Sequence, residues 1–212
     1  IFFDSTYHFL NEFNNMIFRE ETILLKGARM FAFEKISNLL EQKTHDTILE
    51  INLNALSYNL KMYRQLLKKE VGMMVMVKAF SYGSGSSEIA HLLQQEGVEY
   101  LAVAYADEGV ELRKSGIHLP IMVMNTSEAG YENVIQYQLE PEIFSYNSYY
   151  SFKSFLQSKG MNHYPIHLKL DTGMHRLGFM KDELEELLDD IKDNPYFQVK
   201  SIFSHLAEIG RA

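Results

Sequence analysis

The stretch MMVMVKAFSYGSGSSEIAHLLQQEGVEYLAVAY, residues 73–105, decides the fold class. Its apolar run over 73–78 predicts a buried strand, and the glycines and serines that follow predict a turn. Helical spacing of apolar residues over 86–96 and a second apolar run over 100–105 complete the pattern. A strand, a helix and a further strand in this order indicate a βα unit with parallel strands.

The same alternation continues toward the C-terminal end of the chain. Four further strands are expected over 120–124, 141–145, 165–171 and 199–205. Helices are expected near 106–115, 127–137, 147–158 and 181–192. Six short parallel strands in succession fit either a barrel or a doubly wound sheet, and periodicity alone does not choose between these folds.

A half-buried strand is expected before this region. Apolar and polar residues alternate from Thr47 to Leu53, which is the pattern of a strand with one buried face. Asn54 is expected to cap the helix that follows. The predicted apolar stripe of that helix consists of Leu56, Leu60, Tyr63 and Leu67.

The first 43 residues differ in composition from the rest, being rich in Phe and Asn, and are expected to belong to a separate domain. Thr22–Leu25 predicts a strand, Lys26–Gly27 a tight turn, and Met30–Leu40 a helix. Residues 41–46 are polar, and we place the linker at 44–46, so that a second domain runs over 47–212.

Composition narrows the function classes. Hydrophobic residues make up 46% of the chain and charged residues 23%, as in an ordinary globular protein. The net charge of −8 disfavours nucleic acid and anionic lipid as partners. The chain has no cysteine, which excludes disulfides, thiolate nucleophiles and cysteine-bound zinc. No apolar run is long enough for a membrane span and no signal peptide is evident, so we expect a cytoplasmic enzyme, cut from a longer protein.

Lys78 is the first candidate for chemistry, because it ends an apolar strand. Partial desolvation there favours a neutral, nucleophilic amine that can form a Schiff base. The alternative is a lysine that merely extends to solvent. The following Tyr82–Ser87 segment, with Gly83 and Gly85, leads into a helix and could cradle a phosphate or form only a turn.

The segment from His167 to Arg176 carries the strongest pattern. Because side chains alternate along a strand, His167, Lys169 and Asp171 are expected on one face, pointing inside the sheet or barrel. Burying three ionisable groups is costly unless they pair or bind something. Arg176 adds a fixed cation just beyond the strand. The alternative is a Lys169–Asp171 pair that only stabilises the fold.

His205 ends the next strand in the equivalent position. It shares the same rim as the other candidates, although a lone histidine there is often structural. No HExxH pattern or paired His/Asp spacing occurs, so no metal site is predicted.

Three of these segments resemble signatures of the alanine racemases. Val77–Gly85 resembles their pyridoxal-phosphate lysine motif, Lys169–Phe179 their second signature, and Ser204–Ala207 a third. The order matches, and the resemblance covers about 47 to 207. It implies a (β/α)8 TIM barrel of fold-type III, pyridoxal 5'-phosphate as cofactor, and racemisation of alanine, an isomerase reaction.

The resemblance also implies roles for individual residues. Lys78 would hold the cofactor through a Schiff base and act as one of two acid/base groups. Tyr82 would bind the cofactor phosphate, and Arg176 its phenolic oxygen. Lys169, often carbamylated in relatives, would hold Arg176, and His205 would lie beside the cofactor site.

The match has departures. Phe80–Ser81 and Ser84 replace the more usual Asn-Ala and His of the lysine motif. Gly83 and Gly85 are better explained as turn residues, because barrel phosphate sites usually follow strands seven and eight. The end, 208–212, fits the family poorly.

The first 43 residues have a resemblance of their own. Ile23–Arg29, followed by Met30–Leu40, resembles the end of the C-terminal α/β domain of a Mur ligase that adds D-alanyl-D-alanine to the peptidoglycan precursor. A Mur ligase followed by an alanine racemase resembles bifunctional fusion proteins, in which both activities serve D-alanine use in cell-wall synthesis.

The chain offers six barrel strands instead of eight. The family's C-terminal β domain, which supplies the second base across a homodimer interface, has no counterpart in these 212 residues. We therefore expect an incomplete barrel that does not racemise alanine alone. Two alternatives are a non-catalytic pyridoxal-phosphate carrier and a fold-type III amino-acid decarboxylase. A Mur ligase alone is disfavoured, because no ATP-binding loop is present.

Overall fold

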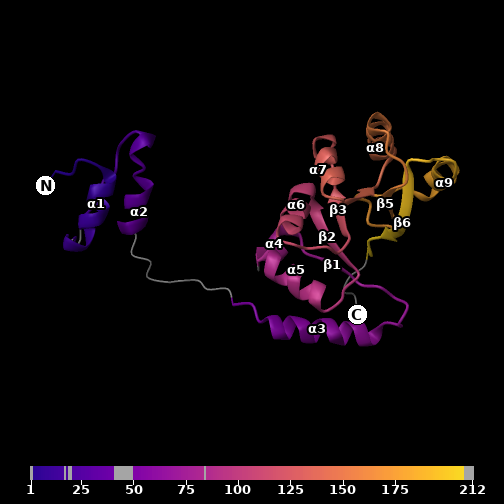
Figure 1. Cartoon of the computed structure of the whole chain (residues 1–212), viewed down its shortest axis with the longest axis horizontal. Coiled ribbons are helices and arrows are strands. Elements are labelled where there is room, and N and C mark those ends of the chain that lie inside the picture. Colours follow the sequence, from indigo (N-terminus) through magenta and orange to yellow (C-terminus); the bar gives the residue numbers. More distant parts are fainter. Residues whose placement is uncertain (1, 17, 19–20, 41–49, 84, 208–212) are drawn as a thin grey trace. The chain divides into compact units, whose positions relative to one another are not determined.

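The computed structural model describes residues 2–16, 18, 21–40, 50–83 and 85–207 (Figure 1). The chain divides into two compact units, residues 1–49 and 50–212, and each is described by itself.

The second unit is built on one sheet of six parallel strands. They are β1 (Met74–Met76), β2 (Tyr100–Tyr105), β3 (Ile121–Asn125), β4 (Glu140–Ile143), β5 (Tyr164–Leu170) and β6 (Phe197–Ser204). Their order in the sheet is their order in the sequence, and every neighbouring pair is parallel. A doubly wound sheet would reverse this order at a switch point. The unit is therefore an incomplete α/β barrel, and all six predicted strands are confirmed.

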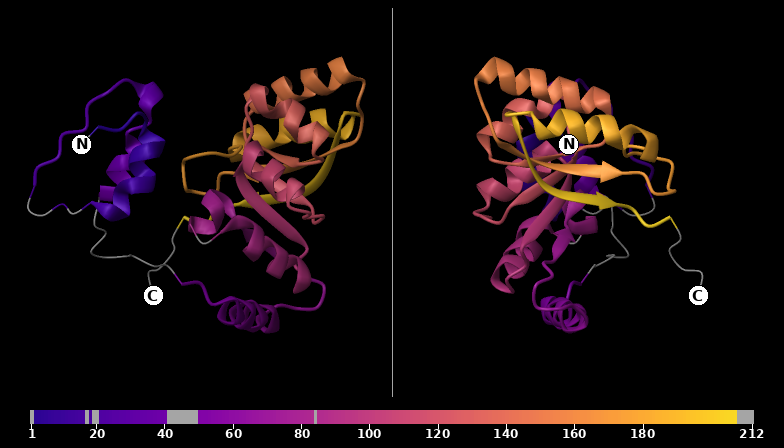
Figure 2. Two further views of the ribbon diagram at one scale, coloured as in Figure 1. Left: turned by 60° about the vertical axis from the view of Figure 1, so that its left-hand side comes forward. Right: turned by 90° about the vertical axis from the view of Figure 1, so that its right-hand side faces the viewer.

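The helices of this unit are α3 (Leu53–Leu66), α4 (Lys78–Gly83), α5 (Ser86–Gln95), α6 (Ala106–Lys114), α7 (Tyr131–Gln136), α8 (Tyr146–Lys159) and α9 (Leu184–Lys192). Helices α5 to α9 lie between successive strands, on the outer side of the curved sheet, whereas α3 precedes β1 and α4 directly follows it (Figure 2). Short 3₁₀ turns, η3 (Glu128–Gly130) and η4 (Lys181–Glu183), precede α7 and α9. The predicted helices between the strands are confirmed, whereas α4 stands where a turn was expected. None of the described helices is both long and apolar enough to cross a membrane.

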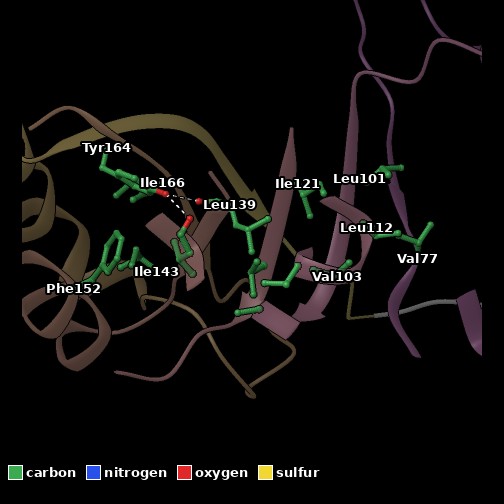
Figure 3. Close-up of a cluster of buried hydrophobic side chains, with 14 of the residues drawn as sticks. Val77, Leu101, Val103, Leu112, Ile121, Leu139, Ile143, Phe152, Tyr164 and Ile166 are labelled. Atoms are coloured by element: carbon green, nitrogen blue, oxygen red, sulfur yellow. Dashed lines mark hydrogen bonds between the residues drawn. The ribbon is translucent and has the colours of Figure 1, made fainter. Parts of the chain in front are cut away.

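The core lies between the strands and these helices. Val103, Ile121 and Ile166 of the sheet are fully buried, as is Phe152 of α8 (Figure 3). The Tyr164 hydroxyl lies 2.9 Å from two backbone carbonyl oxygens of the α7–β4 region, so its polar end is satisfied inside this core. Burial of such side chains contributes about 1.5–3 kcal/mol each to the free energy of unfolding.

The strand predicted from Thr47 to Leu53 is not formed over its described part. Residues 50–52 have no strand partner, α3 already begins at Leu53, and 47–49 lie outside the described residues. Asn52, and not Asn54, caps this helix, because its Oδ1 accepts a hydrogen bond from Ala55 N at 3.0 Å.

The predicted stripe on α3 is only partly correct. Leu60 is buried and Leu56 half-buried, but Tyr63 and Leu67 are exposed. The helical spacing of apolar residues therefore predicted the helix correctly, but not which of its apolar side chains are buried.

The first unit contains α1 (Thr6–Glu12), η1 (Phe13–Asn15), η2 (Arg29–Phe31) and α2 (Glu34–Leu40). The strand predicted at Thr22–Leu25 is wrong: residues 21–28 form no strand, and a strand needs a paired neighbour. The predicted helix is shorter than expected, because Ala32 has a left-handed φ of 48° and separates η2 from α2.

Candidate active site

A pocket at the carboxyl ends of the parallel strands gathers most of the candidate residues. Its volume is about 220 Å³, and its lining comprises Lys78, Ala104, Met124, Asn125, Glu142, Lys169, Arg176 and Leu177. Larger hollows lie in the first unit and beside α7 and α8, where aromatic, apolar and small polar residues dominate the linings. Two more lie around Arg113 and Gln138, near the amino ends of β4 and β5. Reactive groups of parallel α/β folds collect at the carboxyl ends of strands, which favours the smaller pocket.

Lys78 enters this pocket directly after β1. The strand end is held by Val77 N, which donates to Ala102 O at 2.8 Å. Lys78 itself is half-buried, and its Nζ lies 5.9 Å from the centre of the Tyr82 ring. Its place in the pocket lining favours the chemical interpretation of this lysine over simple extension to solvent.

The backbone after Lys78 turns in the left-handed sense. Ala79, Ser81 and Tyr82 have φ of 51°, 53° and 58°, which costs roughly 1–2 kcal/mol for each residue with a Cβ atom. Glu108 anchors the turn, since its Oε1 accepts from Ala79 N at 2.6 Å and its Oε2 from Ala104 N at 2.7 Å. The strained backbone lowers the stability of the fold, and it holds the segment that carries Lys78 in one conformation.

Lys169 and Glu142, both in the lining of the pocket, form a buried ion pair. Lys169 Nζ lies 3.2 Å from Glu142 Oε1, and the two residues are 2% and 1% exposed. Burial raises the pKa of the Glu142 carboxyl to about 7, against the opposing effect of Lys169 and of Arg176. The site therefore holds a carboxyl group that titrates near neutral pH.

A second polar pair lies deeper in the barrel. His167 Nε2 lies 2.9 Å from Glu140 Oε2, and its Nδ1 lies 2.7 Å from Ser201 Oγ. Tyr100 donates its hydroxyl to the same Glu140 oxygen at 3.3 Å. His167 and Lys169 consequently both face the interior, as the alternation along β5 predicted.

Asp171 does not join them, and the alternative interpretation, a Lys169–Asp171 pair, is not formed, because Lys169 pairs with Glu142. β5 ends at Leu170, so strand alternation no longer applies to the next residue. The Asp171 Oδ1 accepts from Gly173 N at 2.8 Å and from His175 N at 3.1 Å, and these bonds lower its pKa. Its role is to shape the loop that carries Arg176.

Sequence reasoning missed both carboxylates of the interior. Glu140 and Glu142 are two residues apart on β4 and therefore share one face, the same signal that identified His167 and Lys169. Their neighbours Pro141 and Ile143 made the segment read as an apolar strand. Two acidic residues two positions apart on one predicted strand, followed by two basic residues two positions apart on the next, are the signal that would have identified them.

The structure brings together Lys78, Lys169 and Arg176, but not every predicted site residue. Tyr82 is 67% exposed and does not line the pocket. His205 follows β6, is half-buried, and does not line it either. Ser84 lies outside the described residues, whereas Gly85 precedes α5 with a φ of 91°, as expected of a turn residue.

Comparison with known proteins matches this sequence and fold to one family. The profile described as "Alanine racemase, N-terminal domain" matches residues 51–211. The chain belongs to the alanine racemase N-terminal domain family. An alanine racemase from Clostridium kluyveri is 39% identical over 163 residues, covering 74% of this chain and 40% of its own length. One from Nostoc is 34% identical over 161 residues, covering 74% and 42%.

Solved structures give the same result. An alanine racemase of Clostridium difficile 630 in complex with cycloserine has a TM-score of 0.71 and 33% identity, covering 79% of this chain and 46% of its own. The alanine racemase of Enterococcus faecalis has a TM-score of 0.68 and 28% identity, covering 74% and 43%. The chain thus spans less than half the length of these relatives.

Alanine racemases use pyridoxal 5'-phosphate, and the pocket suits that group. Lys78 offers the amine that an aldehyde needs, and Arg176 offers a fork of donors for an anionic oxygen. The hydroxyls of Ser81 and Thr126, close in sequence to Lys78 and Asn125 of the lining, are buried without a hydrogen-bond partner among the described residues. Ser81 lies in α4 and Thr126 directly after β3, and a buried hydroxyl without a partner is a kind of group that a polar ligand can satisfy.

Proposed function

We propose that this chain is the cofactor-binding part of a pyridoxal-phosphate-dependent racemase that acts on alanine. The observation that supports it most is the pocket that Lys78 and Arg176 share with the Lys169–Glu142 ion pair, at the carboxyl ends of β1 and β5. The cofactor, when bound, withdraws the negative charge left on the substrate Cα after a proton is removed.

Each lining residue then has a defined task. Lys78 holds the cofactor covalently and carries a proton to or from one face of the substrate Cα. Arg176 fixes the cofactor's phenolic oxygen through charge-assisted hydrogen bonds. Lys169, which also lines the pocket, is assigned by resemblance to holding Arg176 in place. Tyr82 and His205 are assigned to the phosphate and to the rim of the site by resemblance, since neither lines the pocket.

Alanine is favoured as substrate by the relatives, most of which are alanine racemases. One relative, an amino-acid racemase from Enterococcus faecalis, is 34% identical over 164 residues, which cover 22% of its length. A racemase for another small amino acid is therefore the second candidate. The carrier and decarboxylase alternatives have no such support.

Covalent trapping of the cofactor tests the assignment. The 212-residue chain is incubated with pyridoxal phosphate, reduced with borohydride and mapped by peptide mass spectrometry. At limiting cofactor the label is expected on Lys78, and it is lost in Lys78→Ala but kept when the exposed Lys114 is changed to Ala. Equal labelling of many surface lysines, unchanged by Lys78→Ala, would contradict the proposal.

Turnover is a separate matter. The relatives are more than twice as long as the matched region, and we expect them to contribute a second base from a further domain of a homodimer. The 212-residue chain alone is expected to hold cofactor without racemising alanine. Sustained conversion of L-alanine to D-alanine, abolished by Lys78→Ala, would overturn this expectation.

For residues 1–43 we propose descent from the C-terminal domain of a Mur ligase, joined to the racemase for peptidoglycan synthesis. The support is the resemblance of Ile23–Arg29 and the division of the chain into two units. Sequencing the coding region upstream tests it: an ATP-binding loop in the same reading frame is expected, and a start codon directly before Ile1 would contradict the fusion.

A further inference from the structure

Glu142 is the feature of the pocket that its resemblance to the racemases does not explain. It lies on β4, is 1% exposed, and neither of its oxygens accepts a hydrogen bond from the described residues. Lys169 Nζ, 3.2 Å from Oε1, is the cation that pairs with it. Burying a carboxylate in this position costs free energy of folding unless nearby cations compensate its charge.

Those cations are numerous. Among the described residues that line the pocket, Lys78, Lys169 and Arg176 carry basic groups and Glu142 carries the carboxyl group. Lys169 and Arg176 both act on the Glu142 carboxyl electrostatically. Like charges crowded into about 220 Å³ repel one another strongly, and Glu142 is the group placed to offset that repulsion.

Carbamylation of Lys169 would upset this balance. The neutral amine attacks carbon dioxide, an N–C bond forms, one N–H proton leaves, and the product carries a negative charge. At Lys169 the negative carbamate would lie next to the Glu142 carboxylate. A favourable pair of opposite charges would then become a buried pair of like charges. Glu142 would also lose the ammonium group that compensates it.

We propose that Glu142 supplies the anion of this site, so that Lys169 stays an unmodified ammonium group and the Glu142–Lys169 pair, instead of a carbamate, positions Arg176. Glu142 is thus a positioning residue that acts through its neighbours. The proposal refines the racemase site proposed above, but it concerns only side chains of this chain and is testable without cofactor.

Carbon-13 NMR provides the test. The chain is equilibrated with ¹³C-bicarbonate at about pH 8, above the pKa of Glu142. The wild type is expected to show no carbamate resonance, whereas Glu142→Gln shows one that disappears in the Glu142→Gln/Lys169→Arg double variant. Glu140→Gln, two residues earlier on the same strand and paired with His167, is the matched control and is expected to show none.

Bicarbonate should also rescue the variant selectively. If a carbamate replaces the missing anion, added bicarbonate raises the Tm of Glu142→Gln and leaves that of the wild type and of Glu140→Gln unchanged. A general loss of packing would not respond to bicarbonate in this way.

A carbamate resonance in the wild type would overturn the proposal, and this measurement does not depend on any variant folding. Absence of the resonance from Glu142→Gln, and from the smaller Glu142→Ser variant, would overturn the claim that Glu142 keeps Lys169 unmodified. Neither result bears on covalent trapping at Lys78, so failure here is distinguishable from failure of the proposed function.

Discussion

A Cβ atom added to Gly178 would lie 2.5 Å from the backbone nitrogen of Asp171. The two backbone segments meet because Asp171 N donates to Phe179 O at 2.9 Å, and Phe179 N donates to Lys169 O at the same distance. The loop between them is thereby closed against the end of β5. Arg176 sits on this loop, so the glycine contact fixes a site residue.

Gly178→Ala is therefore expected to open the loop. Gly178 has a φ of 132°, and Gly173 in the same loop has a φ of 131°, so both resist a side chain equally on conformational grounds. At Gly173, however, the nearest atom to an added Cβ is a side-chain atom of Ala207 at 3.6 Å. Denaturant unfolding should show a loss of about 1–2 kcal/mol for Gly173→Ala and clearly more for Gly178→Ala. Equal losses would show that the close backbone contact does not matter.

The buried pair of Glu142 and Lys169 predicts strong coupling in stability. Above pH 7, Glu142→Leu and Lys169→Met should each cost about 3–5 kcal/mol, because each leaves one buried charge without its partner. The double variant should lose much less than the sum of the two. Urea unfolding of the four proteins measures the coupling energy, and strictly additive losses would mean that the side chains do not interact.

The raised pKa of Glu142 predicts a pH dependence of known sign. The folded chain binds this proton more tightly than the unfolded chain, whose carboxyl has a pKa near 4.5. The group thus stabilises the fold most below about pH 4.5, and that contribution, about 3 kcal/mol, is lost as the pH rises to about 7. In ¹³C-carboxyl-labelled protein, one glutamate resonance should titrate near neutral pH and be absent from Glu142→Gln. Titration of every glutamate below about pH 5 would contradict the assignment.

Arg113 predicts a stability effect at the opposite end of the barrel. Its guanidinium donates to the carbonyl oxygens of Ile117, Leu119, Tyr137 and Gln138 at 2.6–3.2 Å. Arg113→Lys keeps the charge but loses the planar group that donates to several carbonyls at once, and it should lower the free energy of unfolding by about 2 kcal/mol. The neighbouring Lys114→Ala, on an exposed side chain, should change it by less than about 0.5 kcal/mol. Similar losses of unfolding free energy in the two variants would show that the hydrogen bonds of the Arg113 guanidinium contribute little.

Local sequence signals predicted the barrel strands well, because each strand is an apolar run bounded by turn residues. Alternation along β5 also placed His167 and Lys169 inside correctly. The same rule failed at Asp171, because the strand ends one residue earlier. It failed from Thr47 as well, where an alternating pattern has no partner strand over its described part.

Other features needed the three-dimensional structure. Non-glycine residues rarely adopt positive φ, so propensity argues against the left-handed turn at Ala79, Ser81 and Tyr82. The pairing of Glu142 with Lys169 depends on the register of β4 against β5, which no local pattern specifies. The motif residues could thus be identified from the sequence, but the charges that act on them could not.

Absorbance titration with pyridoxal phosphate tests the central claim, that Lys78 holds this cofactor in the pocket it shares with Arg176, most directly. The account predicts a saturable shift of the cofactor's visible band in the wild type and in Lys114→Ala, and its loss in Lys78→Ala. An identical spectrum for wild type and Lys78→Ala across the titration would contradict it.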